Sequence, residues 1–263
     1  MSADRPPSSG SLTIAGTGIR PGLQTTQEVR DRIRHADKVL FALAEDAPTE
    51  WLRVLNPSAE SMAHLYRPGR PYLDVYAETV STILTWVRRD LDVCAVSYGH
   101  PGVLDQSSRE AVRRAAAEGY ETRFLPGIST LDCLFADLEL DPGTSGCQMF
   151  DATDFLVRDR RPDVSVPMVL FQISLIGETR ATSEVNHDGL RILAGRLAQA
   201  YGAEHEVVVY EATPFPVGRA TIERCSLNRF AEVGVTGMSS LLVPPAAEAP
   251  LDPAMMARLG LSQ

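Results

Sequence analysis

In the first half of the chain, short apolar runs alternate with segments in which apolar residues recur at helical spacing. The apolar runs predict strands at Ser11–Gly18, Lys38–Leu43, Leu91–Val96 and Glu121–Leu125. The helical spacing predicts helices at Gln27–Ala36, Pro48–Leu55, Pro71–Arg88, Gln106–Glu118 and Leu131–Leu138. The pattern of Ser58–Leu65 does not distinguish a strand from a helix. Strands that alternate with helices in this way predict a parallel sheet.

The second half has a different pattern, because its strands follow one another with fewer long helices between them. Strands are predicted at Cys147–Phe150, Met168–Ile173, Glu206–Ala212 and Ser239–Val243. Thr182–Tyr201 reads as a helix, Phe215–Arg219 as a connection, Ala220–Cys225 as a short strand or a helix start, and Pro253–Leu259 as a final helix. The overall prediction is an α/β protein with a mixed second sheet. We divide it into a disordered tail (1–10), an N-terminal α/β lobe (11–141), a C-terminal lobe (142–245) and a C-terminal tail (246–263).

A loop rich in glycine, Tyr98–Val103, follows the apolar strand that ends at Val96 and precedes a helix. Ligands of open α/β sheets bind at the carboxyl ends of strands, and glycines let a ligand approach the backbone closely. Pro126–Thr130 forms a second such turn, with Ser129 and Thr130 at a helix start. Each turn could also be an ordinary connection. The Gly16-Thr17-Gly18 turn lacks the third glycine of a dinucleotide-binding loop, so a nicotinamide cofactor is not expected.

Four of the seven tyrosines fall between positions 66 and 98, namely Tyr66, Tyr72, Tyr76 and Tyr98. Tyr72 and Tyr76 share one face if Pro71 opens a helix. Packing in the core and a role in chemistry are both open interpretations of this cluster.

Composition narrows the range of functions. Of the 263 residues 44% are hydrophobic, and the net charge is −9 without any clustered stripe of Lys and Arg, so nucleic acid is not an expected partner. The four cysteines are scattered, so no metal site is predicted. No signal segment and no apolar run of about 18 residues occurs, which predicts a soluble cytoplasmic protein with no membrane partner.

Several motifs together carry a resemblance to a known family. Ala15–Gly18, Tyr98–Gly102, Leu125–Ser129 and Tyr210–Ala212 occur in the order typical of the tetrapyrrole-methylase superfamily of class III S-adenosylmethionine (SAM) methyltransferases. Within it the chain most resembles the borosin peptide-backbone α-N-methyltransferases, at Tyr98–Gly102, Asp132–Leu138, Asp154–Leu156, Tyr201–His205 and Pro244-Pro245.

The resemblance implies two lobes with SAM in the cleft between them, S-adenosylhomocysteine as the product, and an interlocked homodimer. The implied cofactor contacts are Tyr98, Gly99, His100, Pro101, Gly102, Val103, Ser129, Thr130, Gln172, Tyr210, Glu211, Ala212, Ser239 and Ser240. The implied catalytic residues are Tyr66, Tyr72, Tyr76 and Tyr98. Tyr72 stands where the family has an arginine, and Arg70 or Arg67 is a candidate substitute for that guanidinium.

Methylation of an amide nitrogen requires a base for the N–H proton and hydrogen-bond donors for the developing oxyanion. A tyrosine with an unperturbed pKa of about 10 becomes a strong base when ionised, and its neutral form is a donor. Tyr76 or Tyr66 is the expected base, with Tyr98 and Tyr72 orienting the carbonyl, and His100 shapes the loop. The alternatives are a tetrapyrrole or precorrin-like small-molecule methyltransferase, and a catalytically silent partner protein.

The substrate is expected to be a separate precursor peptide. In the fungal members of the family the methylated peptide is the enzyme's own C-terminal tail, joined through a helical clasp. Here the residues after Pro245, Ala246 to Gln263, span at most about 60 Å when extended, which is too little for both parts. Residues 257–263 also lack the run of apolar residues expected of a backbone-methylated product. The sequence therefore predicts a split system in which the peptide binds in trans.

Overall fold

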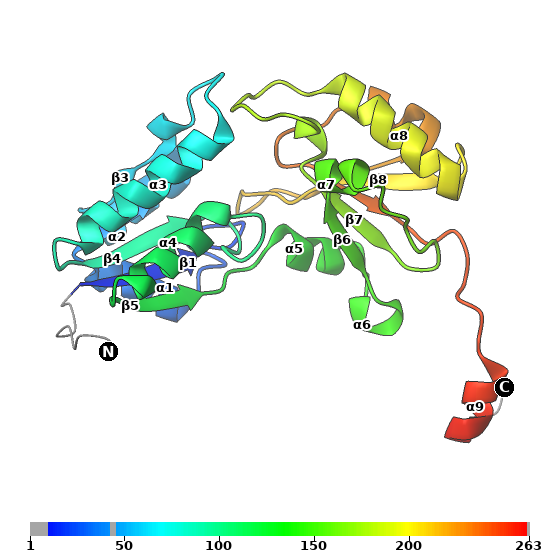
Figure 1. The fold of residues 1–263 in the computed structure, drawn as a ribbon, viewed down its shortest axis with the longest axis horizontal. Coiled ribbons are helices and arrows are strands. Elements are labelled where there is room, and N and C mark those ends of the chain that lie inside the picture. Colours follow the sequence, from blue (N-terminus) through cyan, green and yellow to red (C-terminus); the bar gives the residue numbers. More distant parts are fainter. Residues whose placement is uncertain (1–9, 43–45, 262–263) are drawn as a thin grey trace, which may run out of the picture. The chain divides into compact units, whose positions relative to one another are not determined.

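Two five-stranded sheets organise the chain (Figure 1). The computed structural model describes residues 10–42 and 46–261, without the side chains of residues 46–48. The chain forms two compact units. Unit 1 contains the described residues up to Glu139 together with Glu178–Ser183 and Ala212–Ala220, and unit 2 contains Leu140–Gly177, Glu184–Glu211 and the described residues from Thr221 onward.

The sheet of unit 1 is parallel throughout, with strand order β3-β2-β4-β1-β5. Its strands are β1 (Ser11–Gly16), β2 (Lys38–Phe41), β3 (Glu60–Ser61), β4 (Asp92–Ser97) and β5 (Glu121–Leu125). Its helices are α1 (Gln27–His35), α2 (Asp46–Leu55), α3 (Tyr72–Val87), α4 (Gln106–Ala117) and α5 (Thr130–Asp137), with a 3-10 turn, η1 (Ala63–Leu65). The prediction of a parallel α/β sheet is confirmed.

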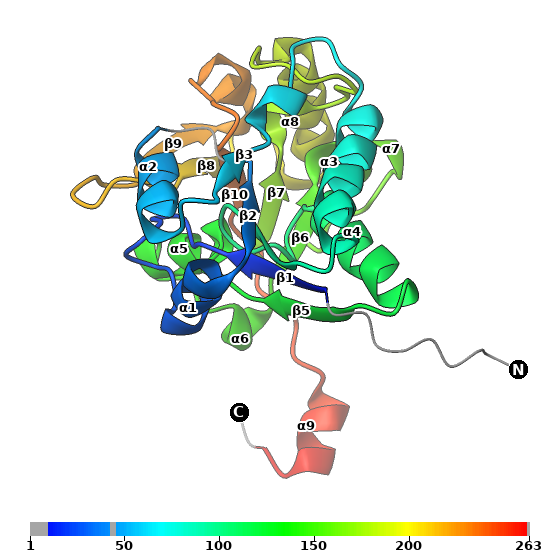
Figure 2. The ribbon, with the colours of Figure 1, turned by 90° about the vertical axis from the view of Figure 1, so that its left-hand side faces the viewer.

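Helices cover both faces of this sheet, and the central strand β4 shows why (Figure 2). Val93 and Ala95 pack into the core shared with α3 and α4, whereas Cys94 and Val96 pack into the core shared with α1 and α2. A strand whose successive side chains are buried on opposite faces reads as a continuous apolar run. Burial of each large apolar side chain contributes about 1.5–3 kcal/mol, so these two cores are what hold the loops at the strand ends in place.

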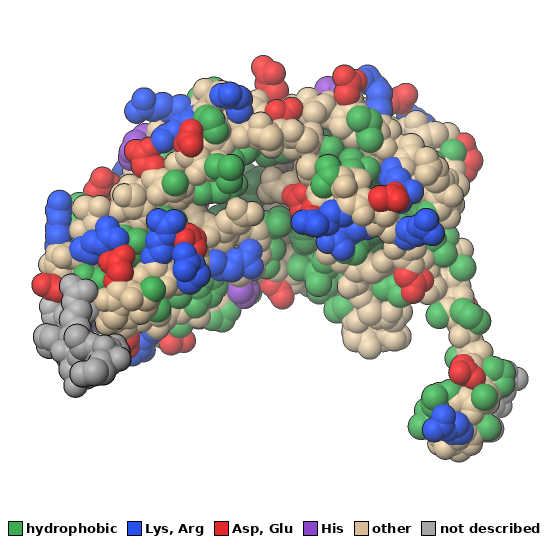
Figure 3. Space-filling view, viewed as in Figure 1, with side chains coloured by type: hydrophobic (Ala, Val, Ile, Leu, Met, Phe, Trp, Pro, Cys, Tyr) green, Lys and Arg blue, Asp and Glu red, His purple; other side chains and the backbone are tan. Residues whose placement is uncertain are grey.

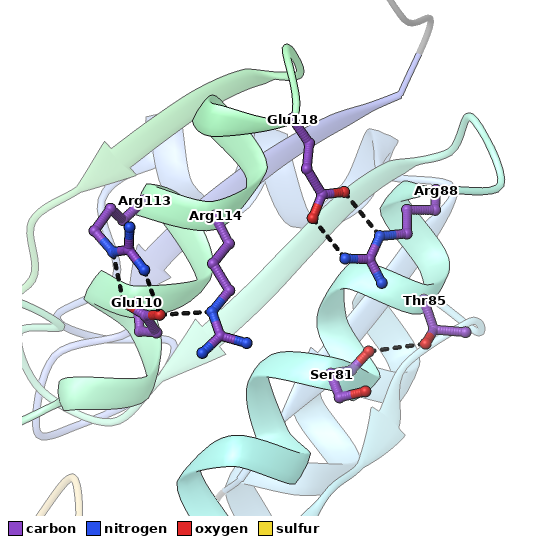
Figure 4. A network of polar contacts seen from close by, with 7 residues as sticks. All are labelled: Ser81, Thr85, Arg88, Glu110, Arg113, Arg114 and Glu118. Atoms are coloured by element: carbon purple, nitrogen blue, oxygen red, sulfur yellow. Dashed lines mark hydrogen bonds and ion pairs between the residues drawn. The ribbon is translucent and has the colours of Figure 1, made fainter.

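Ion pairs lie on the outer surface of α3 and α4 (Figure 4). Arg88 at the end of α3 contacts Glu118 after α4 with an Nε–Oε2 distance of 2.8 Å, and Glu110 contacts Arg113 and Arg114 on α4. The drawn face of the molecule shows basic and acidic side chains interspersed (Figure 3). Exposed pairs of this kind contribute only about 0–1 kcal/mol each, so apolar packing dominates the stability of unit 1.

The sheet of unit 2 is mixed, with strand order β6-β7-β10-β8-β9. Its strands are β6 (Gln148–Asp151), β7 (Met168–Phe171), β8 (Glu206–Glu211), β9 (Thr221–Ser226) and β10 (Ser240–Val243). The β6–β7 pair is parallel, and the other three pairs are antiparallel. This confirms the mixed sheet that was predicted for the second half of the chain. The helical elements of unit 2 are α6 (Pro142–Ser145), α7 (Ala152–Val157), η2 (Ile173–Leu175), α8 (His187–Tyr201), η3 (Leu227–Glu232) and α9 (Pro253–Leu259). Side chains of α7, α8 and η3 form one core with the sheet.

The structure corrects the predicted start of α8, which is His187 rather than Thr182. The side chain of Asn186 caps the helix by accepting a hydrogen bond from the Gly189 N–H at 3.0 Å. The preceding residues 178–183 belong to unit 1, where Thr179 and Ala181 form backbone hydrogen bonds with the loop before α3 and the first residue of that helix. The helical spacing behind the prediction comes from Leu190, Leu193, Leu197 and Tyr201, all of which lie after the cap at Asn186.

Other differences are local. The short helix α6 begins at the predicted boundary between the two lobes, and Asp141 accepts a hydrogen bond from the Gly143 N–H. The sequence pattern did not indicate α7 or η3, whereas Ala220–Cys225 proves to be mostly strand β9. The ambiguous segment Ser58–Leu65 divides into β3 and η1. The predicted tail up to residue 9 and the last residue of the predicted strand Lys38–Leu43 lie outside the described residues.

Candidate active site

Three glycine turns meet at the carboxyl ends of the adjacent strands β4, β1 and β5. The N–H of Gly18 donates to the carbonyl of Gly99 at 3.2 Å, and the N–H of Gly99 donates to the carbonyl of Gly18 at 3.1 Å. The turn after β5 approaches the same point, because Gly127 lies beside Gly16. Such an edge of a parallel sheet is where this class of fold binds ligands.

The close approach of these turns requires glycine at two positions. A Cβ atom at Gly16 would lie 2.5 Å from the Gly99 carbonyl oxygen and 2.8 Å from the Gly127 nitrogen. A Cβ atom at Gly127 would lie 2.8 Å from the Gly16 carbonyl carbon and closer still to the Gly99 oxygen. These atoms belong to backbone and cannot move aside. The result is a bare main-chain surface built from three turns.

The loop after β4 is braced from within by His100. Its Nδ1 atom accepts a hydrogen bond from the Gly102 N–H at 2.8 Å. The carbonyl of Gly102 accepts a hydrogen bond from Arg109 of α4 at 3.3 Å. Gly99 has φ +66°, a left-handed conformation that other residues adopt with strain. This geometry suits the loop-shaping role expected for His100.

Ser129 and Asp132 form a reciprocal cap at the start of α5. The Ser129 N–H donates to the Asp132 carboxylate at 2.6 Å, and the Ser129 hydroxyl donates to the same oxygen at 2.7 Å. Ser129 is buried, and Thr130 begins the helix. The predicted cap is therefore present, and its hydroxyl is engaged within the chain.

Asp105 is a candidate that sequence reasoning missed. Its carboxylate accepts hydrogen bonds from the hydroxyls of Ser97 at 2.8 Å and Ser107 at 2.9 Å, and from the hydroxyl and the N–H of Ser108. It thereby joins the end of β4 to the first turn of α4, directly after the loop Tyr98–Val103. The Asp-Gln-Ser-Ser sequence at a helix start was the available signal, since aspartate is a preferred cap.

Three of the four predicted catalytic tyrosines come together in unit 1. The rings of Tyr72 and Tyr76, one turn apart in α3, are stacked with their centroids 6.0 Å apart. Burial raises the pKa of Tyr66 to about 12, with further contributions from the charges that Tyr76, Asp105 and Tyr72 carry when ionised. Tyr66, at the end of η1, is 38% exposed. Asp105 therefore stands near the tyrosines as well as at the end of the glycine loop.

Tyr98 is placed differently. It continues the alternation of β4 and packs against the core between the sheet and helices α1 and α2, which also contains Cys94 and Val96. The three other tyrosines lie around the start of α3, which packs on the opposite face of the sheet.

Arg70 and Arg67, the two candidate substitutes for the arginine of the family, both form hydrogen bonds with residues near them in the sequence. Arg70 pairs with Glu78 of α3 and donates to the Leu65 carbonyl at 3.3 Å. Arg67 donates to the His64 carbonyl at 3.2 Å.

In unit 2 the remaining predicted cofactor residues gather at one edge of the sheet. Ser240 pairs with Tyr210, and the same register places Ser239 opposite Glu211. On the other side, the pairing of Leu241 with Leu170 continues to place Ser239 opposite Gln172. The Ser239 hydroxyl donates to the Glu211 carboxylate at 3.1 Å.

Two details define what this edge offers. Gln172 directly follows β7 in a left-handed conformation with φ +58°, which is uncommon for a residue other than glycine and recurs at functional sites. The Tyr210 side chain is fully buried, so only its main chain is available to a ligand. The chain returns to unit 1 at Ala212.

No group of three or more His, Cys, Asp or Glu side chains in residues 10–42 and 46–261 is arranged to hold a metal ion. None of the described helices is both long enough and apolar enough to cross a membrane.

Comparison with known proteins shows the family to which the chain belongs. The family described as Tetrapyrrole (Corrin/Porphyrin) Methylases matches residues 11–225. The methyltransferase and precursor of the cyclic gymnopeptides from Gymnopus fusipes is 37% identical over 90% of this chain and 57% of its own length. A type I borosin methyltransferase and precursor from Gymnopilus junonius is 35% identical over 98% of this chain and 62% of its own length. The chain thus spans less than two thirds of these relatives.

The solved structures agree on the fold. A uroporphyrin-III C-methyl transferase from Thermus thermophilus, complexed with S-adenosyl homocysteine, superposes with a TM-score of 0.61. It is 17% identical and covers 90% of this chain, which covers 98% of that structure. The predicted two-sheet α/β fold and the resemblance to borosin-type methyltransferases are both confirmed, and the chain belongs to the tetrapyrrole (corrin/porphyrin) methylase family.

Proposed function

We propose that this chain is a SAM-dependent methyltransferase that methylates backbone amide nitrogens of a ribosomally made peptide. The observation that carries the proposal is the gathering of Tyr66, Tyr72 and Tyr76 in unit 1 of a chain from this family. The relatives, by their names, are methyltransferases joined to precursors of ribosomally synthesized cyclic peptides. A tyrosine cluster suits a peptide substrate, because removing the proton of an amide nitrogen needs a stronger base than a histidine.

The glycine turns of unit 1 suit SAM. The three glycine turns offer bare N–H and C=O groups that a side chain would cover, which favours close approach of a nucleoside and its substituents. In unit 2, Glu211, Ser239 and Gln172 bring a carboxylate, a hydroxyl and an amide to one edge of the sheet, a set of groups that suits hydrogen bonding to a polar small molecule. When bound, SAM supplies an activated methyl group.

The tyrosines divide the remaining chemistry. Because the charge of an ionised Tyr76 is one cause of the raised pKa of Tyr66, the pair favours a state in which only one phenol is ionised. We assign Tyr76 as the base that takes the amide proton and Tyr66 as a neutral donor to the amide oxygen. Tyr72, stacked on Tyr76, is a second donor. Donors aimed at a developing oxyanion typically contribute about 3–4 kcal/mol each.

We further propose that the peptide is a separate chain and that the enzyme works as a homodimer in the cytoplasm. The relatives carry enzyme and precursor in one polypeptide, so the separate peptide is a distinguishing feature of this proposal.

The test is coexpression with the peptide encoded by the neighbouring reading frame, followed by intact and fragment mass spectrometry of both chains. Added methyl groups on backbone nitrogens of the peptide, and none on the enzyme, are the expected result. Methyl groups on the C-terminal tryptic fragment of the enzyme would overturn the separate-peptide arrangement. Methylation of uroporphyrinogen III, with none of the peptide, would instead establish a small-molecule enzyme.

A further inference from the structure

Residues 178–183, which we call the strap, lie along the loop that carries Tyr66 and Tyr72. The N–H of Gly69 donates to the Ala181 carbonyl, and the N–H of Ala181 donates to the Arg70 carbonyl, both at 2.8 Å. The N–H of Tyr72 donates to the Thr179 carbonyl at 3.0 Å. Although the strap is more than 100 residues away in sequence, it belongs to the same compact unit as this loop.

Arg180 adds a side-chain bond to this backbone pairing. Its Nη1 atom donates to the carbonyl oxygen of Gly69 at 2.8 Å, and its backbone bridges Pro71. The next residue, Ala181, is only 5% exposed, so the strap is seated on the unit rather than lying loosely over it. A hydrogen bond from a charged donor is roughly twice as strong as one between neutral groups.

The strap supplies a hydrogen-bond acceptor to the first residue of α3. The first four N–H groups of a helix have no partner within the helix, and side chains normally supply one. Pro71 precedes α3 and provides no side-chain cap, whereas the N–H of Tyr72 is satisfied by Thr179 of the strap. The residues before it, Arg67 to Pro71, lie outside regular secondary structure. The position of Tyr72 therefore depends on the strap, and so does the first turn of α3, which leads to Tyr76.

We propose that Arg180 is a positioning residue for methyl transfer, which fixes the loop between Tyr66 and Tyr72 so that the three phenols converge on one peptide group. The proposal rests on the proposed function in assigning chemistry to those phenols. Arg180 acts through Gly69 and does not contact the substrate. Its loss should lower the turnover number while leaving SAM affinity intact.

The first test is hydrogen exchange of the wild-type protein and three variants, followed by mass spectrometry of fragments covering 66–76. In Arg180→Ala we expect exchange of these amides to accelerate about tenfold, with exchange elsewhere unchanged. Arg180→Lys keeps a charged donor and should restore much of the protection. Arg196→Ala is the matched control, because Arg196 also donates to a main-chain carbonyl, that of Arg160 at 3.0 Å, but in unit 2.

The second test measures turnover on the peptide that the wild-type enzyme methylates, with SAM affinity measured by titration calorimetry. We expect the turnover number of Arg180→Ala to fall at least tenfold with SAM affinity within about twofold of wild type, and Arg180→Lys to recover most of it. Ala181→Pro, which deletes the N–H that bonds Arg70, should give the same pattern.

Unchanged exchange at 66–76 in Arg180→Ala, or unchanged turnover despite faster exchange, would overturn the proposal. Equal losses in Arg196→Ala would do so as well, because they would reveal a general loss of stability. If the wild-type enzyme methylates no peptide, the proposed function fails, and the exchange experiment still decides whether Arg180 fixes the loop.

Discussion

The rings of Tyr72 and Tyr76 stack at 6.0 Å between centroids, with an angle of 22° between their planes. The two residues lie one turn apart at the start of α3, so the helix itself aligns their phenols. Tyr66 joins them from η1, and its pKa responds to both neighbours. A group of phenols that share charge in this way can provide a base and hydrogen-bond donors at the same place.

Removing single hydroxyls from this cluster should separate chemistry from binding. We expect Tyr76→Phe to lower the turnover number about a hundredfold or more, the usual scale for a positioned base. Tyr66→Phe should lower it by a similar factor through loss of a donor to the oxyanion. Steady-state kinetics and SAM titration measure the two effects, with Tyr120→Phe, which packs against the core of α3 and α4, as control. Full activity in both variants would remove tyrosines from the mechanism.

The stability of the protein should fall at high pH because folding raises the pKa of two phenols. The pKa of Tyr66 is raised from 10.0 to about 12, and burial together with the charge of Asp163 raises that of Tyr201 to about 12. Folding favours the protonated form of each, so this stabilisation is complete below pH 10 and is lost as the pH rises towards about 12.

Denaturant midpoints measured from pH 8 to 12, roughly the range set by these pKa values, should therefore drop more steeply for the wild type than for a Tyr66→Phe/Tyr201→Phe double variant. Phenolate absorbance should show two fewer late-titrating tyrosines in that variant. Identical pH profiles for the two proteins would contradict this assignment of the raised pKa values.

The glycine turns can be tested with a pair of identical substitutions. Gly127→Ala places a methyl group against the backbone of Gly16 and Gly99, which cannot yield, so we expect a loss of about 1–3 kcal/mol in the free energy of unfolding and of SAM binding. Gly195→Ala, in the middle of α8 with open space around it, should raise stability by up to about 1 kcal/mol. Thermal unfolding and calorimetry measure both, and wild-type SAM affinity in Gly127→Ala would argue against a cofactor at the turns.

Glu211 should contribute to SAM binding through its charge. Its carboxylate accepts hydrogen bonds from the hydroxyls of Thr236 at 2.5 Å and Ser239 at 3.1 Å. Glu211→Gln keeps the shape but weakens these bonds, and we expect SAM affinity to fall about tenfold, as for loss of one charge-assisted bond. Glu206→Gln, at the other end of β8, removes only an exposed pair with Arg224 and should leave affinity unchanged. Equal affinities for the two variants would exclude a role for the Glu211 charge.

Local pattern was sufficient to predict much of unit 1. The continuous apolar run Leu91–Val96 is a central strand because α1 and α2 cover one of its faces and α3 and α4 cover the other. Gly99 and Gly127 are recognisable in the sequence because glycine after a strand indicates a turn, and both turns lie at the strand ends where they were predicted. Strands and turns can be predicted from sequence because their signals lie in a few consecutive residues.

The capping signals show the limit of such reasoning. Helical spacing predicted α8 from Thr182, but the amide of Ala181 and the carbonyl of Thr179 pair with a loop far away in sequence, and the helix begins only at His187. Asp105 has the residue type of a cap, yet its nearness to Tyr66 depends on how η1, β4 and α4 pack.

The sequence by itself determined which residues can do the chemistry: tyrosines close together along the chain, glycines after strands, and a Glu211-Ala212 pair at a strand end. Tertiary structure decided which of them meet. It stacked Tyr72 on Tyr76, brought Tyr66 to them, placed Tyr98 on the other face of the sheet, and laid Arg180 across the loop at Gly69. The physical reason is that propensity and periodicity act over a few residues, whereas these contacts arise from side-chain packing and backbone pairing between segments distant in the chain.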